Sequence, residues 1–243
     1  MSKRQLSARI EPFDSYWQAP EDVEKGYSSF RTYYRHNILP HLPTDRSTEI
    51  LIVSAGPGYL VSLLADEGYT KVRGIDSDPE KVAHATKRGL PVEVETAFEY
   101  LEAHPASFDV IVGEQELNHL TKAEMLDFLG LARNSLRPGG LALVYGLNGA
   151  NPIVGAETLA QNIDHFHTFT GYSLTQALEL ADFHDIKVFP LRLWVFWKNP
   201  LNYIGLAATF LLELMCRALF ALYGKKNKTW TKKIAATARR ASP

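Results

Sequence analysis

From Glu49 onward, short apolar runs alternate with stretches whose apolar residues recur at helical spacing. Such short runs predict strands, and the spacing between them predicts crossover helices. The runs are almost continuously apolar, which is typical of strands buried on both faces of a parallel sheet. The expected strands cover residues 49–53, 71–75, 91–95, 108–112 and 141–145, with helices expected over 58–67, from 78, and over 121–136.

The regular alternation ends after Gly146. Residues 147–171 resemble a loop, and we then expect a helix over 172–180, a strand over 185–189, an apolar helix over 201–223 and a closing strand over 229–238. The first 45 residues are rich in aromatic side chains and are expected to form a helical cap. We therefore predict an α/β fold, Rossmann-like and doubly wound, with a mostly parallel seven-stranded sheet. A cap over 1–45 would precede the main domain over 46–243, with an apolar C-terminal helix over 201–224.

The apolar stretch Leu201–Tyr223 leaves three placements open. Glu213 and Arg217 are its charged residues, four positions apart. Its length suits a bilayer span, but charges near the middle of a span are costly in lipid. The helix could also pack on the domain or on a partner in a homodimer, or lie in a membrane interface. The lysines that follow fit the interfacial placement and equally a solvated helix exit: Lys225, Lys226, Lys228, Lys232 and Lys233.

Composition narrows the class of protein. The 243 residues suit one α/β domain, and 26 basic against 27 acidic residues argue against nucleic acid as a partner. A single cysteine, Cys216, excludes an internal disulfide and a cysteine-based zinc site. Residues 1–20 lack the apolar core of a signal peptide. We therefore expect a cytoplasmic protein, with peripheral contact at the inner membrane face through 201–224 as the open alternative.

A candidate ligand loop follows the first strand. It has the sequence Ser54-Ala55-Gly56-Pro57-Gly58, in which glycines allow the backbone to pass close to a ligand. Asp76 ends the second strand, where a carboxylate can accept hydrogen bonds from both ribose hydroxyls. In an open parallel sheet, ligands bind beyond the carboxyl ends of the strands, so loop and acid are expected to meet there.

These landmarks resemble class I S-adenosylmethionine-dependent methyltransferases over Glu49–Val144. The resemblance includes Gly74-Ile75-Asp76, Phe108-Asp109-Val110-Ile111 and the turn Leu136-Arg137-Pro138-Gly139-Gly140. It implies S-adenosyl-L-methionine as the cofactor. It also implies the cofactor-binding residues: Asp76 and Ser77 at the ribose, Thr96, Ala97 and Phe98 at the adenine, and Ser54, Gly56, Gly58 and Glu114 at the methionine part.

Three positions depart from the family pattern. Ile52 stands where the family usually has a strand-one aspartate, and Ser54 stands where it has its first glycine. Thr96 replaces the aspartate that commonly faces the adenine, although Glu95 keeps a carboxylate beside it. These departures keep a non-catalytic binding or scaffold protein among the alternatives.

Methyl transfer to oxygen or nitrogen is an in-line displacement that needs an acceptor for the nucleophile's proton. Residues 113–119 resemble the acidic segment of the family, with Asn118 in place of the usual glutamate, and they supply Glu114 and His119 as candidates. Residues 149–152 and 164–174 resemble small bacterial methyltransferases of surface-polysaccharide or glycoside biosynthesis, in which His165 matches the family histidine. The candidate catalytic residues are therefore His165, His119 and Glu114.

The resemblance favours O-methylation of a sugar hydroxyl in a glycan or glycolipid precursor, with histidine as general base. A small-metabolite N- or C-methyltransferase is the alternative enzyme. Tyr16, Trp17, Asn148 and His167 are candidate substrate residues. No metal is assigned: Asp109, Glu114, Glu116, His119, Asp164 and His165 offer Mg²⁺ ligands, but spacing does not show that they converge.

Overall fold

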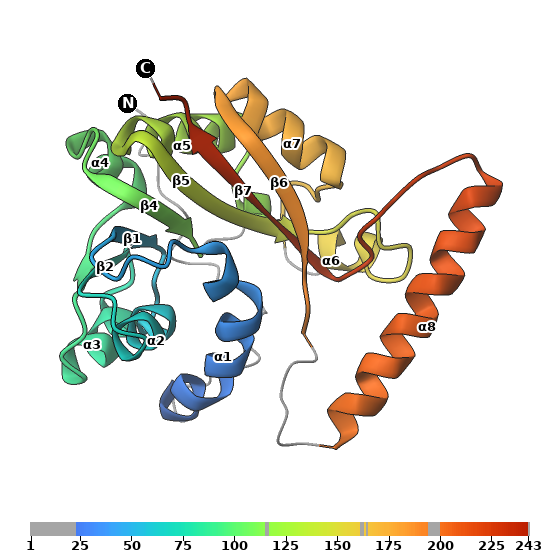
Figure 1. Ribbon diagram of the computed structural model, residues 1–243, viewed down its shortest axis with the longest axis horizontal. Coiled ribbons are helices and arrows are strands. Elements are labelled where there is room, and N and C mark those ends of the chain that lie inside the picture. The colour runs from blue at the N-terminus through green and yellow to red at the C-terminus, as the bar shows by residue number, and fades with distance from the viewer. Residues whose placement is uncertain (1–22, 115–116, 161–162, 164, 194–199, 243) are drawn as a thin grey trace.

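The computed structural model describes residues 23–114, 117–160, 163, 165–193 and 200–242. Its centre is a seven-stranded sheet in the order β3-β2-β1-β4-β5-β7-β6 (Figure 1), so the predicted α/β fold is confirmed. The strands are β1 Glu49–Val53, β2 Lys71–Asp76, β3 Val92–Val94, β4 Phe108–Gly113, β5 Leu136–Leu147, β6 Phe183–Leu191 and β7 Lys233–Arg240. The helices are α1 Val23–Asn37, α2 Tyr59–Asp66, α3 Pro79–Lys87, α4 Ala97–Ala103, α5 Lys122–Ser135, α6 Gly155–Ala160, α7 Gly171–Leu180 and α8 Leu201–Leu222, with 3-10 turns η3 Leu39–His41 and η4 Leu117–His119.

The sheet separates two hydrophobic cores. Strands β1 to β5 pair in parallel, whereas β7 runs antiparallel to both β5 and β6. Helices α4, α5 and α7 bury residues such as Phe98, Phe128 and Leu174 in one core. Helices α2 and α3 bury Leu60 and Ala85 in the other. The carboxyl ends of β1, β2, β4, β5 and β6 consequently share one edge of the sheet.

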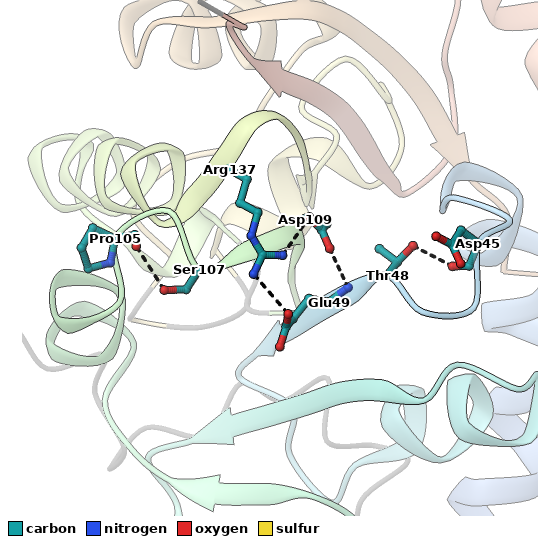
Figure 2. A network of polar contacts seen from close by, with 7 residues as sticks. All are labelled: Asp45, Thr48, Glu49, Pro105, Ser107, Asp109 and Arg137. Atoms are coloured by element: carbon teal, nitrogen blue, oxygen red, sulfur yellow. Dashed lines mark hydrogen bonds and ion pairs between the residues drawn. The ribbon is translucent and has the colours of Figure 1, made fainter.

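The opposite edge is held by a polar network around Arg137 (Figure 2). Its guanidinium donates to Asp109 at 2.9 Å and to Glu49 at 3.1 Å, and Asp109 also accepts from the Glu49 amide at 2.9 Å. These contacts join the starts of β1, β4 and β5. Asp109 therefore lies at the far end of β4 from Glu114 and cannot join it as a metal ligand. Among the described residues, no group of three or more acids, histidines and cysteines is placed to hold a metal.

Strand β5 begins five residues before its predicted start. Leu136 already pairs with Phe108, and the register then shifts before Val110 pairs with Leu141. The Pro138-Gly139-Gly140 turn is thus an irregularity inside the strand. A Cβ on Gly140 would lie 2.8 Å from the Arg137 carbonyl oxygen, which explains why glycine occupies that position.

The segment after β5 also differs from its prediction. Part of the expected loop forms α6, and β7 begins at Lys233 instead of residue 229. The Asn148 amide accounts for the later start, because it donates to the carbonyls of Thr229 and Thr231 and holds them outside the sheet. Side-chain capture of backbone carbonyls in this way competes with strand pairing.

Helix α8 confirms the predicted apolar helix but not its packing against the domain. It stands away from the sheet (Figure 1), and only 6% of its most apolar 18-residue stretch is buried inside the protein. Within the described part of the chain, it is the helix that is long and apolar enough to cross a membrane. The chain after α8 returns to the domain through Trp230, whose ring meets Phe220 edge-on at 4.4 Å.

Candidate functional site

The loop between β1 and α2 is held in left-handed conformations. Ser54, Gly56 and Gly58 have φ values of 57°, 53° and 83°. A Cβ on Gly58 would press on Leu90 at 3.0 Å, whereas one on Gly56 would meet nothing within 4 Å. Gly58 is therefore a packing glycine, and Gly56 leaves open space over the backbone. Ser54 adopts the conformation of the glycine it replaces, at a strain cost of about 1–3 kcal/mol that functional sites commonly carry.

Asp76 lies directly beside this loop. Its carboxylate accepts from the Gly56 amide at 2.7 Å and from the Asp78 amide at 2.9 Å. Burial raises the pKa of Asp76, and the two amide hydrogen bonds oppose that rise. A carboxylate has about four acceptor positions, so each oxygen retains one for a further donor. This arrangement can receive a pair of hydroxyl groups at the loop.

The predicted adenine-side turn follows β3 at the same edge. The Glu95 amide donates to the Asp76 carbonyl at 3.0 Å, which ties the turn to the end of β2. Thr96 is half-buried and its hydroxyl donates to Glu99 at 2.8 Å, while Ala97 and Phe98 lie in the core. Ser77 is half-buried directly after Asp76. Thr96 and the adjacent backbone are thus the parts of this turn that face outward.

Glu114 ends β4 on the other side of the loop. Its amide donates to the Val53 carbonyl at 2.9 Å, which places it next to the start of the loop. Burial raises the pKa of its carboxyl to about 8, with the nearby Asp76 adding to the rise and a hydrogen bond from Tyr34 opposing it. Tyr145 of β5 donates to the Glu114 carbonyl. Two tyrosines therefore hold an acid that is mostly protonated at neutral pH.

Helix α1 closes over the glycine loop. The Tyr27 hydroxyl donates to the Pro57 carbonyl at 2.5 Å, and Arg88 stacks on the Tyr27 ring at 3.8 Å. Gly26 allows close approach, because a Cβ there would lie 2.3 Å from the Tyr59 ring. Within the described residues, this N-terminal segment contributes α1 over Val23–Asn37. Sequence reasoning did not identify Tyr27, Tyr34 or Tyr145 as site residues, although the aromatic-rich cap was a signal for the first two.

Two candidate catalytic histidines meet beyond β4 and β5. The rings of His119 and His165 pack edge to face with centroids 4.5 Å apart. His165 is buried, and its Nδ1 hydrogen-bonds the Thr158 carbonyl oxygen. A carbonyl can only accept, so Nδ1 carries the proton and Nε2 of the neutral ring is the basic nitrogen. The Phe166 amide donates to the Asn118 carbonyl at 2.8 Å, which joins the two histidine segments.

The remaining candidates have different surroundings. Asn148 is buried, and its side chain bonds the backbone at Thr229, Thr231 and Ala150, which favours a structural role. The ring nitrogens of His167 have no hydrogen-bond partner among the described residues, and burial lowers its pKa. The fully buried Asn118 amide is similarly without a partner in the described part of the chain. Tyr16, Trp17, Glu116 and Asp164 lie outside the described residues.

The part of the chain that contains the glycine loop, Ser54–Gly58, matches a known protein family. Residues 50–140 match the model of a family described as a methyltransferase domain. The chain is 33% identical over 120 residues to the ubiquinone biosynthesis O-methyltransferase of Sodalis glossinidius, covering 44% of this chain and 47% of that protein. The corresponding protein of Cereibacter sphaeroides is 34% identical over 119 residues, with the same coverage. The chain therefore spans about half the length of the curated relatives it matches.

Solved structures extend the likeness to most of the chain. A methyltransferase of Archaeoglobus fulgidus, described as S-adenosylmethionine-dependent, aligns with a TM-score of 0.65 at 14% identity, over 88% of this chain and 94% of that one. Haemonchus contortus phosphoethanolamine N-methyltransferase 2, solved with S-adenosyl-L-methionine, aligns with a TM-score of 0.59 at 16% identity, over 94% and 60%. Residues 50–140 thus match a methyltransferase domain, and most of the chain shares its fold with S-adenosylmethionine-dependent methyltransferases.

Proposed function

We propose that the chain transfers a methyl group from S-adenosylmethionine to a hydroxyl oxygen of its acceptor. The observation that carries this proposal is the placement of two acids, Asp76 and Glu114, on either side of a loop whose Gly56 faces open space. Ile52, at the position of the usual strand-one acid, is fully buried in the core. The two acids at the loop therefore carry the polar recognition in this chain.

The cofactor would lie along the carboxyl ends of β2, β1 and β4. Asp76 would accept the ribose hydroxyls at its two remaining acceptor positions, with Ser77 beside it and the Thr96 turn at the adenine. The exposed backbone at Ser54 and Gly56 and the carboxyl of Glu114 would hold the methionine part. A cation near Glu114 favours its ionised form, so binding would shift a group whose pKa is about 8 toward the carboxylate.

S-Adenosylmethionine supplies an electrophilic methyl group on a sulfonium sulfur. His165 is the general base in this proposal, since its Nδ1 is fixed as the donor and its Nε2 accepts the hydroxyl proton. His119 packs against that ring and orients it. Proton removal by a positioned base typically contributes about 10²–10⁴-fold to a rate.

Two acceptor classes are consistent with this site. Oxygen as the nucleophile is supported by the relatives, which are described as O-methyltransferases of ubiquinone biosynthesis. The sequence pattern around His165 favours a sugar hydroxyl of a glycan or glycolipid precursor. In both cases a neutral hydroxyl needs a base, which the histidine pair supplies. Amine acceptors would instead call for acidic side chains around the methyl group.

The test is transfer of labelled methyl groups to three acceptor sets: quinol and phenol precursors, lipid-linked sugars, and amines. We expect an O-methylated product from one of the first two sets, identified by its stability to base and by mass spectrometry. Product from the amine set alone would contradict the oxygen acceptor. Absence of product together with absence of cofactor binding would contradict the enzyme assignment and favour a scaffold protein.

A further inference from the structure

Helix α8 exposes its apolar side chains, unlike an ordinary surface helix of a globular protein. At roughly 100° per residue, its polar side chains fall within an arc of roughly 80°: Asn202, Thr209, Glu213 and Arg217. The least exposed residues of the helix, Asn202 and Cys216, lie on the same side. A surface helix normally turns its apolar stripe inward and its polar face to water. Here the less exposed side carries Asn202, Thr209 and Glu213 beside the apolar Leu206, Cys216 and Phe220, and Arg217 is exposed at its margin. Most of the large apolar side chains face out.

The outward side is large and continuous. Its big apolar side chains are each 48–82% exposed and cover an arc of roughly 220°. They are Leu201, Tyr203, Ile204, Phe210, Leu211, Leu214, Met215, Leu219, Leu222 and Tyr223. The apolar stripe that a helix of a globular protein typically buries is about 100° wide or somewhat more. A second copy of the chain would therefore leave much of this surface in water, whereas lipid would cover it.

Sheet topology excludes a membrane-spanning α8. The helix is inserted between β6 and β7, which are hydrogen-bonded neighbours in one sheet. If α8 crossed a bilayer once, those two strands would lie on opposite sides of it. A second crossing needs about 20 apolar residues, and residues 192–200 and 223–232 do not supply them. Irregular backbone cannot replace a helix there, because lipid leaves its polar groups unsatisfied.

Charge at the end of α8 indicates the type of membrane. Lys225, Lys226 and Lys228 follow the helix directly, and all three side chains are exposed. Basic residues beside a membrane-bound helix each raise its affinity for anionic lipid roughly fivefold. We propose that α8 lies in the plane of an anionic bilayer, with its apolar side in the lipid and its polar side toward the protein.

This position also bears on the acceptor, in a step that rests on the proposed function. Leu191 at the end of β6 and Leu147 at the end of β5 both pair with Lys233 at the start of β7. Helix α8 thus leaves the sheet at the edge where Glu114 and His165 lie. If α8 lies in the bilayer, this edge of the sheet is the part of the site nearest to the membrane. That position suits an acceptor whose reactive ring or sugar is carried on a lipid tail.

The experiment is flotation of the full chain with vesicles in which about a third of the lipid is phosphatidylglycerol. We expect the chain to float with these vesicles, less well with pure phosphatidylcholine, and less well at high salt.

Leu211→Glu with Leu214→Glu should weaken vesicle binding roughly hundredfold or more, because two leucines that would be buried in the lipid are lost. Leu180→Glu is the matched control, since this leucine is 74% exposed on α7 and should have no effect. Lys225→Glu with Lys226→Glu should weaken binding to the anionic vesicles at least about tenfold, and Lys87→Glu on α3 is the control for this pair.

Orientation is tested with a fluorophore on a single cysteine in a Cys216→Ser chain. A probe at Leu211→Cys should be quenched by lipid-carried quenchers, and one at Glu213→Cys should not. A chain that stays in solution, or a dimer that the two leucine substitutions disrupt without vesicle binding, would overturn the proposal. Calorimetry of the unsubstituted chain with S-adenosylhomocysteine separates the two claims. A chain that floats but does not bind this ligand counts against the proposed chemistry, and a chain that binds it but does not float counts against the placement of α8.

Discussion

The carboxyl edge of the sheet has two halves that are built differently. Around β1, β2 and β4, backbone geometry forms the site: Gly56 donates to Asp76, and α1 closes over the loop through Tyr27. Around β5 and β6, side chains form it, with His165 packed on His119 and a long insertion carrying α8. The family match over residues 50–140 includes β1, β2 and β4 of the first half and His119 of the second, whereas α1, His165 and α8 lie outside it. We call the first the cofactor half and the second the acceptor half, after the roles proposed above for their residues.

The comparison predicts that the two halves control different kinetic quantities. His165→Ala should lower turnover by about 10²–10⁴-fold while cofactor affinity changes little, because the side chain lies in the acceptor half. Steady-state kinetics and calorimetry on the same preparation measure both. Equal losses in turnover and affinity would assign His165 a folding role. His184→Ala is a matched control, because His184 lies on exposed β6 surface.

Asp76→Ala tests the cofactor half. Removing a charged acceptor of two hydroxyl groups should weaken S-adenosylmethionine binding at least about tenfold, given about 1.5–3 kcal/mol for such hydrogen bonds. Asp78→Ala is the control, since Asp78 caps α3 through the amides of Glu80 and Lys81. That variant should lose about 0.5–2 kcal/mol of stability but keep its affinity. Unchanged affinity in Asp76→Ala would refute the ribose role.

Glu114 stands between the halves and gives the site a pH dependence. Its folded pKa of about 8 exceeds the ordinary glutamate value of 4.5, so the folded protein binds more protons than the unfolded chain between these values. The free energy of unfolding should therefore fall as pH rises from about 5 to 8, by up to about 1.4 kcal/mol per unit. Denaturant titrations of Glu114→Gln should lack this component, while Glu179→Gln on α7 should retain it. An unaltered profile in Glu114→Gln would contradict the raised pKa.

Tyr27→Phe should have the smallest effect. It removes one hydrogen bond from α1 to the Pro57 carbonyl, which is worth about 0.5–1.5 kcal/mol. Cofactor affinity should fall about two- to tenfold if the cap orders the loop. Tyr172→Phe is the control, because Tyr172 is 75% exposed on α7. Equal cofactor affinities of the two variants in calorimetry would contradict a role of Tyr27 in cofactor binding.

Much of the cofactor half could be predicted from sequence. Glycines after a strand, an acid at a strand end and apolar strands are local signals, so the loop, Asp76 and the mostly parallel seven-stranded sheet were predicted. Strand β5 was predicted too short because Pro138-Gly139-Gly140 is typical of a turn. The bulge that includes this turn depends on pairing with Phe108, which is 28 residues away in sequence from Leu136.

Contacts between segments that are distant in sequence were less predictable. The hydroxyl of Tyr34 meets Glu114, and Asn148 holds Thr229 and Thr231, through contacts that no local pattern encodes. The existence of α8 followed directly from its apolar length. Its placement did not, because sequence spacing could not show that its large apolar side chains face away from the protein and that β6 and β7 share one sheet.

The most direct test of the central claim is calorimetric titration of the full chain with S-adenosylmethionine and S-adenosylhomocysteine. We expect one site for each ligand and affinity that rises from pH 6 to pH 8 as Glu114 ionises. Asp76→Ala should abolish most of that affinity. Folded wild-type protein that binds neither ligand across this pH range would contradict the account.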